Sequence, residues 1–231
     1  LPGFRESRFH SPTGRLRLPL PVMTAQTRFE SSAEEQHVDY ALRLTHFFGD
    51  SEVGLSLFKG TSRDPVFLPG VDDNNAPILI PYYAQLQQVG IDLQSLLEDW
   101  IWKWELVYRD QENGSYTATT AGFEYTFYGI LGSAIDMGTL LEYSYDSRDD
   151  SEAGAFNNDV FGGLRFAFND VQSTQILAGA FVDTDNGSST IRMEASRRLG
   201  DSWKLTTEMQ VFTNIDDEDV LNAFARDDFL L

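Results

Sequence analysis

The chain has no cysteine among its 231 residues and only three histidines. Without thiols it can form no disulfide and no thiolate metal site, and it offers no cysteine nucleophile. Its 17 Lys and Arg residues are outnumbered by 36 Asp and Glu residues, which gives a net charge of −19. Because so acidic a surface repels a phosphate backbone, we expect no nucleic-acid partner.

Long apolar runs are also missing, and no segment reaches the roughly 18 continuous apolar residues that a membrane helix requires. The composition is nevertheless 42% hydrophobic and 13% aromatic, which is too apolar for a disordered protein. The sequence contains no glycine-rich phosphate loop and no histidines at metal-ligand spacing. These absences exclude a helical membrane protein and leave open an all-β protein, whose strands need no long apolar run.

The main positive signal is alternation of apolar and polar residues, which is typical of strands with two different faces. Trp100, Trp102 and Trp104 alternate with Lys103 and Glu105. The same pattern recurs around residues 38–45, 122–127, 136–146, 163–169, 191–198 and 203–211. Residues 86–97 also fit a helical period, but we predict a strand there. We count about ten strands of roughly 9 to 12 residues, the length that crosses a bilayer, whereas soluble strands centre near 5 to 6.

Short and long connections alternate along the chain. Short turns are predicted at 49–51, 98–99, 129–134, 169–170 and 199–201, and longer connections at 61–80, 147–157, 183–189 and 214–226, with a shorter one at 110–115. Outer-membrane barrels have short periplasmic turns and longer outer loops. The sequence therefore predicts an all-β, antiparallel, up-and-down transmembrane β-barrel in a bacterial outer membrane, with about 12 strands when complete and a range of 10 to 14.

Residues 1–35 differ from the rest, and we predict a boundary between this segment and a barrel over 36–231. The segment contains five arginines and prolines at positions 12, 19 and 21. Proline removes a ladder donor, so an interior strand is not expected, and the segment is an outer loop, an edge strand or a plug. The chain opens on Leu1 and ends just after a strand begins at 227–231, so we expect a mature or truncated chain.

Several short motifs are similar to those of a family of uncharacterised proteobacterial outer-membrane β-barrel (porin-like) proteins. They are Pro2-Gly3-Phe4-Arg5-Glu6, Gly14-Arg15-Leu16-Arg17, Gly60-Thr61-Ser62-Arg63-Asp64-Pro65, Gly122-Phe123-Glu124-Tyr125-Thr126-Phe127, Asn158-Asp159-Val160-Phe161, Asn169-Asp170-Val171-Gln172-Ser173-Thr174 and Arg197-Arg198-Leu199-Gly200-Asp201. The resemblance covers nearly the whole chain and implies a barrel without an assigned activity. This chain lacks the leading portion of those longer proteins and their aromatic last residue.

In such a barrel one face of each strand lines the lumen and the other contacts lipid. We expect the following residues to line the lumen: Asp39, Arg43, Asp92, Lys103, Glu105, Arg109, Glu124, Glu142, Arg165, Arg192, Glu194, Arg198, Lys204 and Glu208. These charges form either a structural network that partly fills the barrel or a constriction that selects permeants. The aromatic residues expected at the membrane interface are Trp100, Trp102, Tyr108, Tyr143, Tyr145 and Trp203.

The acidic excess lies mainly in the predicted loops, including Asp149, Asp150, Asp216, Asp217 and Asp219. Such carboxylates could bind Ca²⁺ or Mg²⁺, enrich cations at a pore mouth, or simply keep a loop solvated. The last interpretation is favoured, and no resident cofactor is expected.

An enzyme is not expected either, and the alternative weighed against this is an outer-membrane lipid hydrolase with a Ser–His–acid site. His37 and Asp39 share a strand face near Ser31 and Ser32, but no motif places a serine beside the histidine for nucleophilic catalysis.

Three functions fit these observations. The first is a pore or channel for small polar solutes or ions. The second is a non-conducting barrel that is a structural or assembly partner of a larger envelope complex, plugged by its own arginine-rich start or by another subunit. The third is a soluble ligand-binding β-barrel. In the first two, outer-membrane lipid is a partner, and the oligomeric state stays open.

Overall fold

The computed structural model describes residues 4–14, 17–111, 114–148, 157–223, 225–226 and 228–230, and these residues form an all-β fold. The long strands are β2 (Tyr40–Phe48), β3 (Ser51–Thr61), β6 (Gln85–Leu97), β7 (Trp100–Gln111), β8 (Gly114–Phe127), β9 (Asp136–Asp146), β10 (Asn158–Ala167), β11 (Gln175–Asp183), β12 (Ser189–Leu199) and β13 (Trp203–Thr213). The short strands are β1 (Arg28–Phe29), β4 (Val66–Val71), β5 (Pro77–Tyr83) and β14 (Phe229–Leu230). Four 3₁₀ turns, η1 (Thr24–Gln26), η2 (Glu34–Gln36), η3 (Ile130–Gly132) and η4 (Val220–Ala223), complete the elements.

The strands form two sheets. One has the order β1-β5-β4, and the other has eleven strands in the order β14-β13-β12-β11-β10-β9-β8-β7-β6-β3-β2. The ten long strands have 9 to 14 residues, in agreement with the predicted lengths. Neighbouring strands from β8 to β14 are antiparallel, and the ambiguous segment 86–97 is a strand, β6. Within the described residues the large sheet has two free edges. No helix there has the length and apolarity to span a membrane.

The chain divides into two compact units. Unit 1 comprises residues 1–45, 54–91 and 107–117, and unit 2 comprises residues 46–53, 92–106 and 118–231. This division does not fall after residue 35, because the N-terminal segment is hydrogen-bonded to a strand of unit 1. The N–H of Leu79 in β5 donates to the carbonyl of Pro21, and the N–H of Met23 donates to the carbonyl of Leu79.

The buried centre of unit 1 is built around β5. Ile78, Ile80 and Tyr83 are almost completely buried, and β5 pairs with β4 on one side and with β1 on the other. The expectation of a long open connection over 61–80 is therefore wrong, since this stretch holds β4 and half of β5. Prolines at 65, 69, 77 and 81 hid the alternation. The hairpin tolerates Pro69 because β4 is an edge strand, where a missing N–H leaves no ladder bond unmade.

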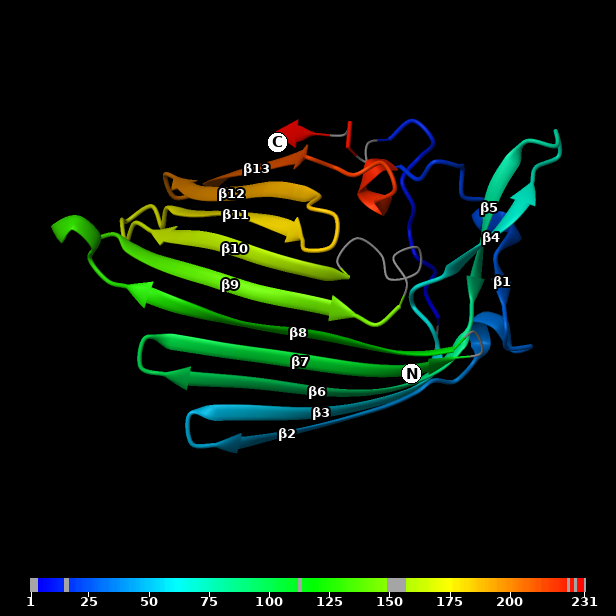
Figure 1. Cartoon of the computed structure of the whole chain (residues 1–231), viewed down its shortest axis with the longest axis horizontal. Helices are drawn as coiled ribbons and strands as arrows, with labels where there is room; N and C mark the ends of the chain where they lie inside the picture. Colours follow the sequence, from blue (N-terminus) through cyan, green and yellow to red (C-terminus); the bar gives the residue numbers. More distant parts are fainter. Residues whose placement is uncertain are drawn as a thin grey trace. The chain divides into compact units, whose positions relative to one another are not determined.

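In unit 2, five short connections lie at the same end of the strands. They span 49–50, 98–99, 128–135, 168–174 and 200–202, and Figure 1 shows them together at the left. The three tightest of these turns are closed by residues with left-handed backbone, namely Gly49 (φ 59°), Glu98 (φ 56°) and Gly200 (φ 65°). The predicted positions of these turns are thus confirmed, although the connections at 128–135 and 168–174 have eight and seven residues. The connection predicted as longer at 183–189 has only five residues, 184–188, so the predicted alternation of short and long connections is wrong at that point. The strand predicted after residue 226 is also confirmed, because Phe229 of β14 pairs with Gln210 of β13.

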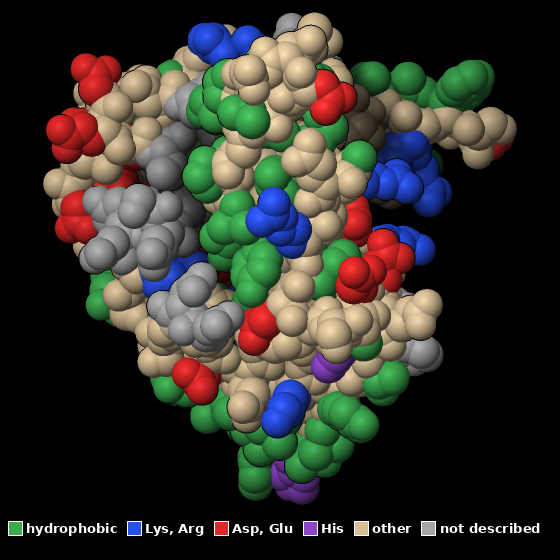
Figure 2. Space-filling view, turned by 90° about the vertical axis from the view of Figure 1, so that its right-hand side faces the viewer, with side chains coloured by type: hydrophobic (Ala, Val, Ile, Leu, Met, Phe, Trp, Pro, Cys, Tyr) green, Lys and Arg blue, Asp and Glu red, His purple; other side chains and the backbone are tan. Residues whose placement is uncertain are grey.

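At the other edge of the large sheet, β2 has no neighbour beyond it in the described part of the chain. All nine of its side chains are exposed, including Tyr40, Leu42, Leu44 and Phe47. Figure 2 shows hydrophobic side chains gathered at the lower edge, the height at which Figure 1 places β2. An edge this long and apolar is normally covered or paired in a stable protein.

Candidate functional site

The register of the unit 2 strands sorts their side chains onto two faces. Tyr143 lies opposite Ala121 and Val160, whereas its neighbour Glu142 lies opposite Gly122 and Phe161. We call the first surface the apolar face; it includes Trp100, Trp102, Trp104, Phe123, Tyr125, Phe127, Leu141, Tyr143, Tyr145, Val160, Leu164, Val182, Ile191, Leu199, Trp203 and Leu205. We call the second the polar face; it includes Glu124, Glu142, Asp146, Asp159, Arg165, Asp183, Arg192, Glu194, Arg198, Lys204 and Glu208.

Side-chain contacts place the tryptophans of β7 on the apolar face. The ring centroids of Trp100 and Trp102 lie 5.3 and 5.2 Å from that of Phe123. The indole N–H of Trp104 donates to the hydroxyl of Thr119 at 3.0 Å. Trp203 lies opposite Leu199 on the same face. All four tryptophans of the chain therefore share one side of the sheet.

On the middle strands of unit 2, the apolar side chains are exposed while several carboxylates of the polar face are buried. On β9, the apolar side chains of Leu141, Tyr143 and Tyr145 are 44%, 41% and 43% exposed. Asp146, at the end of the same strand, is only 9% exposed. A soluble sheet buries its apolar face against a core and leaves its polar face in water.

Three further carboxylates on the polar face are buried as well. Glu124, Asp159 and Asp183 are only 5%, 3% and 6% exposed. Asp159 and Asp183 lie directly opposite each other on β10 and β11. These three carboxylates are therefore shielded from water, although they lie on the charged face of the sheet.

One of these carboxylates is held by an ion pair that crosses a strand. Glu124 of β8 pairs with Arg165 of β10, although β9 lies between them. Gly138 of β9 lies under the pair, and a Cβ there would be 2.9 Å from Oε1 of Glu124. A Cβ at this position would force the end of the Glu124 side chain to shift, so glycine leaves the ion pair the most room.

Other glycines of the polar face make room in the same way. A Cβ on Gly122 would lie 2.5 Å from Cγ of Glu142 and 2.5 Å from the carbonyl oxygen of Leu141. A Cβ on Gly179 would lie 2.4 Å from the ring of Phe161. At these positions the missing Cβ leaves space for large side chains from neighbouring strands.

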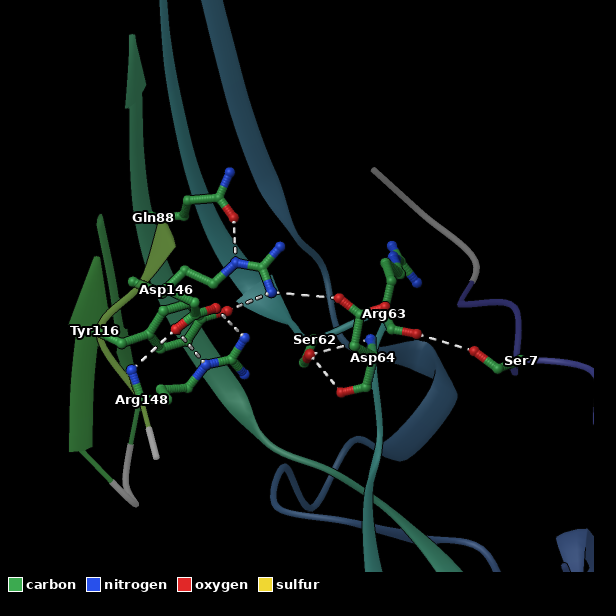
Figure 3. Close-up of polar contacts among 9 residues, drawn as sticks. Ser7, Ser62, Arg63, Asp64, Gln88, Tyr116, Asp146 and Arg148 are labelled. Atoms are coloured by element: carbon green, nitrogen blue, oxygen red, sulfur yellow. Dashed lines mark hydrogen bonds and ion pairs between the residues drawn. The ribbon is translucent and has the colours of Figure 1, made fainter. Parts of the chain in front are cut away.

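In unit 1, Arg109 of β7 is the centre of a polar network. Its guanidinium donates to Oε1 of Gln88 at 2.6 Å and to the hydroxyl of Tyr116 at 2.9 Å, and contacts Oδ2 of Asp64 at 3.3 Å. Figure 3 shows these three partners, which come from β6, from β8 and from the segment after β3. Asp64 is 80% exposed, so this ion pair is open to water.

Asp39 differs from the open lining residue that the sequence suggested, because it is only 2% exposed. Its Oδ1 accepts the Thr61 N–H at 2.9 Å and contacts Nδ1 of His37 at 3.0 Å, while the Arg63 guanidinium donates to Oδ2 at 2.7 Å. Gly60 leaves the space, since a Cβ there would lie 2.2 Å from Oδ1. The carboxylate is therefore enclosed by its partners.

Arg63 also covers an aromatic cluster. Its guanidinium carbon lies 4.7 Å above the ring of Phe4, which packs edge-on against Tyr83 at 4.7 Å and against Phe29 at 5.3 Å. The Tyr83 hydroxyl accepts the Ser7 N–H at 2.9 Å. Two motifs quoted from the sequence, around Phe4 and around Gly60 to Pro65, thus meet here. The sequence alone did not reveal this contact.

The remaining expected lining residues lie on strands as alternation requires. Lys103 and Glu105 are exposed and alternate with the β7 tryptophans, Asp92 alternates with Leu93, and Arg43 is exposed on β2. Arg192 pairs with Glu194 along β12 at 2.6 Å. Of the expected interface residues, Tyr108 belongs to unit 1 and is 45% exposed, and the other five lie on the apolar face.

The described acidic loop residues Asp216 and Asp219 accept hydrogen bonds from backbone N–H groups of their own turns. Asp216 accepts the Glu218 N–H at 2.9 Å, and Asp219 accepts the Leu221 N–H at 2.7 Å. Asp217 is exposed, and Asp149 and Asp150 lie outside the described residues. No group of three or more metal-ligating side chains occurs in the described part. The suggestion of a bound divalent cation therefore gains no support here.

Two turn carboxylates have lowered pKa values. Hydrogen bonds from the hydroxyl and N–H of Thr174 lower the pKa of Asp170, in the turn before β11. The backbone N–H groups of Ala76 and Asn74 lower that of Asp72, in the turn after β4. In both turns the hydrogen bonds favour the charged form and fix the connection.

The His37–Asp39 pair does not extend to a nucleophile. Within the described residues, the Ser31 hydroxyl accepts the N–H of Ala33, and no serine is hydrogen-bonded to His37. Comparison of the chain with models of protein families, with curated proteins and with solved structures gives no match. The resemblance noted from the motifs stays a prediction, and function has to be argued from the geometry.

Proposed function

We propose that the large sheet closes into an outer-membrane β-barrel, with its apolar face against lipid and its polar face around a water-accessible lumen for small polar solutes or ions. The exposed apolar face, together with the buried carboxylates on the opposite face, carries this proposal. In hydrocarbon an exposed apolar face is stable, and a charged face is stable only when it is turned inward. Strand length supports it too, since 9 to 14 residues suffice to cross a bilayer at a tilt.

Closure of the sheet would pair the backbone groups at its two free edges. An open sheet leaves a row of unpaired N–H and C=O groups at β2, and each such group in lipid costs several kcal/mol. The short turns at one end of unit 2 fit the periplasmic side of such a barrel.

The lining residues expected from the sequence include seven acidic and seven basic side chains. A wall with equal numbers of both charges exerts little net preference for cations or anions. We therefore infer that any ion preference arises from the acidic connections, which focus cations at the mouth.

The test is single-channel conductance of the full chain in a planar bilayer, with cysteine probes. Because the chain has no native cysteine, each variant carries one reactive thiol. We expect a negatively charged, water-soluble methanethiosulfonate to change the conductance of Glu142→Cys and Arg192→Cys. It should not change that of Leu141→Cys or Ile191→Cys, whose positions are adjacent but on the apolar face.

A folded, membrane-inserted chain that conducts nothing would contradict the pore and favour the non-conducting envelope partner. Modification of Leu141→Cys as fast as of Glu142→Cys would contradict the assignment of faces. Recovery of folded chain in buffer without detergent would contradict the membrane location and favour the soluble barrel.

A further inference from the structure

A pocket of about 270 Å³ lies in unit 1, between the N-terminal segment and β4. Phe9, Leu18, Leu20 and Phe67 form its apolar wall, and the rings of Phe9 and Phe67 meet edge-on at 5.4 Å. A 150 Å³ cavity holds one benzene, so this space has room for an apolar group of about ten non-hydrogen atoms.

The polar side chains that line the pocket are all basic. They are Arg8, His10 and Arg17, and none of the described lining residues is acidic. This is unusual in a chain with a net charge of −19. The excess of basic residues extends to the whole N-terminal segment, since residues 1–29 contain five arginines and one glutamate, a net charge of +4.

The arginines are suited to hold an anion beside the apolar wall. Arg17 is half-buried, and its guanidinium donates to the carbonyl of Gly14 at 3.1 Å, which fixes its position. That bond uses one of five N–H donors, and the planar group can offer others to a carboxylate or phosphate. Arg8 is exposed at the same pocket.

We propose that this pocket binds a small amphiphile with one anionic head, a carboxylate or a phosphate, on a short apolar chain. The arginines recognise the head and the wall accepts the chain. The site belongs to unit 1 alone and does not depend on conduction, so a chain that passes no current can still bind.

The test uses the full chain in non-ionic detergent micelles, with histidine ring NMR signals as the readout. His10 lines the pocket, whereas His46 lies on β2 and reports on amphiphile that merely partitions into the micelle. Decanoate and decyl phosphate should shift the His10 signals to saturation. Decanol and inorganic phosphate at equal concentrations should not, because each lacks one half of the ligand. The signals that disappear in the His10→Gln variant are those of His10.

An Arg8→Gln, Arg17→Gln variant should bind decanoate at least about tenfold more weakly, the loss expected for charge-assisted bonds. Arg8→Gln alone leaves the Arg17–Gly14 bond intact and should weaken binding in the same direction. An equal response to decanol, an equal response to inorganic phosphate, or unchanged affinity in both variants would overturn the proposal. Shifts of His46 without shifts of His10 would overturn it as well.

Discussion

Single glycines decide how the side chains of the polar face pack. Gly122 is the sharpest case, because an added Cβ would meet a backbone oxygen that cannot rotate away. We predict that Gly122→Ala destabilises the protein by about 1–3 kcal/mol, the usual cost of overpacking. Gly162→Ala is the matched control, since its Cβ would meet nothing within 4 Å. Urea unfolding followed by tryptophan fluorescence measures both. Equal midpoints for the two variants would contradict the packing described here.

The stability of the fold should depend on the ion pair between the buried Asp39 and Arg63. Arg63→Leu leaves the carboxylate enclosed without its cation, and we expect a loss of about 3–5 kcal/mol. Adding Asp39→Asn should restore part of that loss, because the uncompensated charge is gone. Arg197→Leu is the control, since it breaks only an exposed pair at 3.9 Å and should cost about 0–1 kcal/mol. A double variant no more stable than Arg63→Leu would contradict the pairing.

At the scale of elements, the turn between β10 and β11 should make stability depend on pH. The folded-state pKa of Asp170 is lowered by Thr174, so its contribution is present above the unfolded pKa and is lost as pH falls through the folded one. Asp170→Asn should therefore be less stable than the parent at neutral pH, and the difference should shrink under acid. Unfolding midpoints between pH 7 and about pH 2 test this. Asp201→Asn, in the exposed turn before β13, is the control, and a pH-independent difference for Asp170→Asn would contradict the prediction.

Elements with plain alternation could be predicted from the sequence, and those interrupted by proline could not. The strands around Trp102, Tyr143 and Ile191 and the five short turns follow from period-two patterning and turn residues, which act locally. The β4–β5 hairpin was missed because prolines interrupt its pattern and its partners lie in the N-terminal segment. The enclosure of Asp39 by Arg63 was missed for a related reason, since the contact joins residues 24 positions apart through a space left by Gly60.

At the scale of the whole molecule, the shared face of the four tryptophans gives a direct test of lipid contact. In vesicles of brominated phosphatidylcholine we expect the fluorescence of the full chain to fall to about half or less of its value in unbrominated vesicles. Aqueous iodide should quench it little, because this face would be turned away from water. The reverse pattern, strong quenching by iodide and little by bromine, would place the tryptophans in water and contradict the proposed barrel.

The distribution of charge predicts how ion preference depends on salt. If acidic connections rather than the wall select cations, the preference should be clear at 0.1 M salt, where the Debye length is about 10 Å, and should weaken near 1 M, where it is about 3 Å. Reversal potentials under a fixed concentration ratio measure this. A preference that stays constant with salt would instead indicate selection by charges at close range inside the lumen.

The ion pair between Glu124 and Arg165 also constrains folding. Alternation alone penalises a strand that slips by one residue, because every side chain changes face, but a slip of two residues keeps the faces correct. If β9 slipped by two, Leu140 or Asp136 would take the place of Gly138 beneath the pair, and its larger side chain would crowd the two charges. The glycine and the ion pair together therefore distinguish the native register from its nearest face-preserving alternatives.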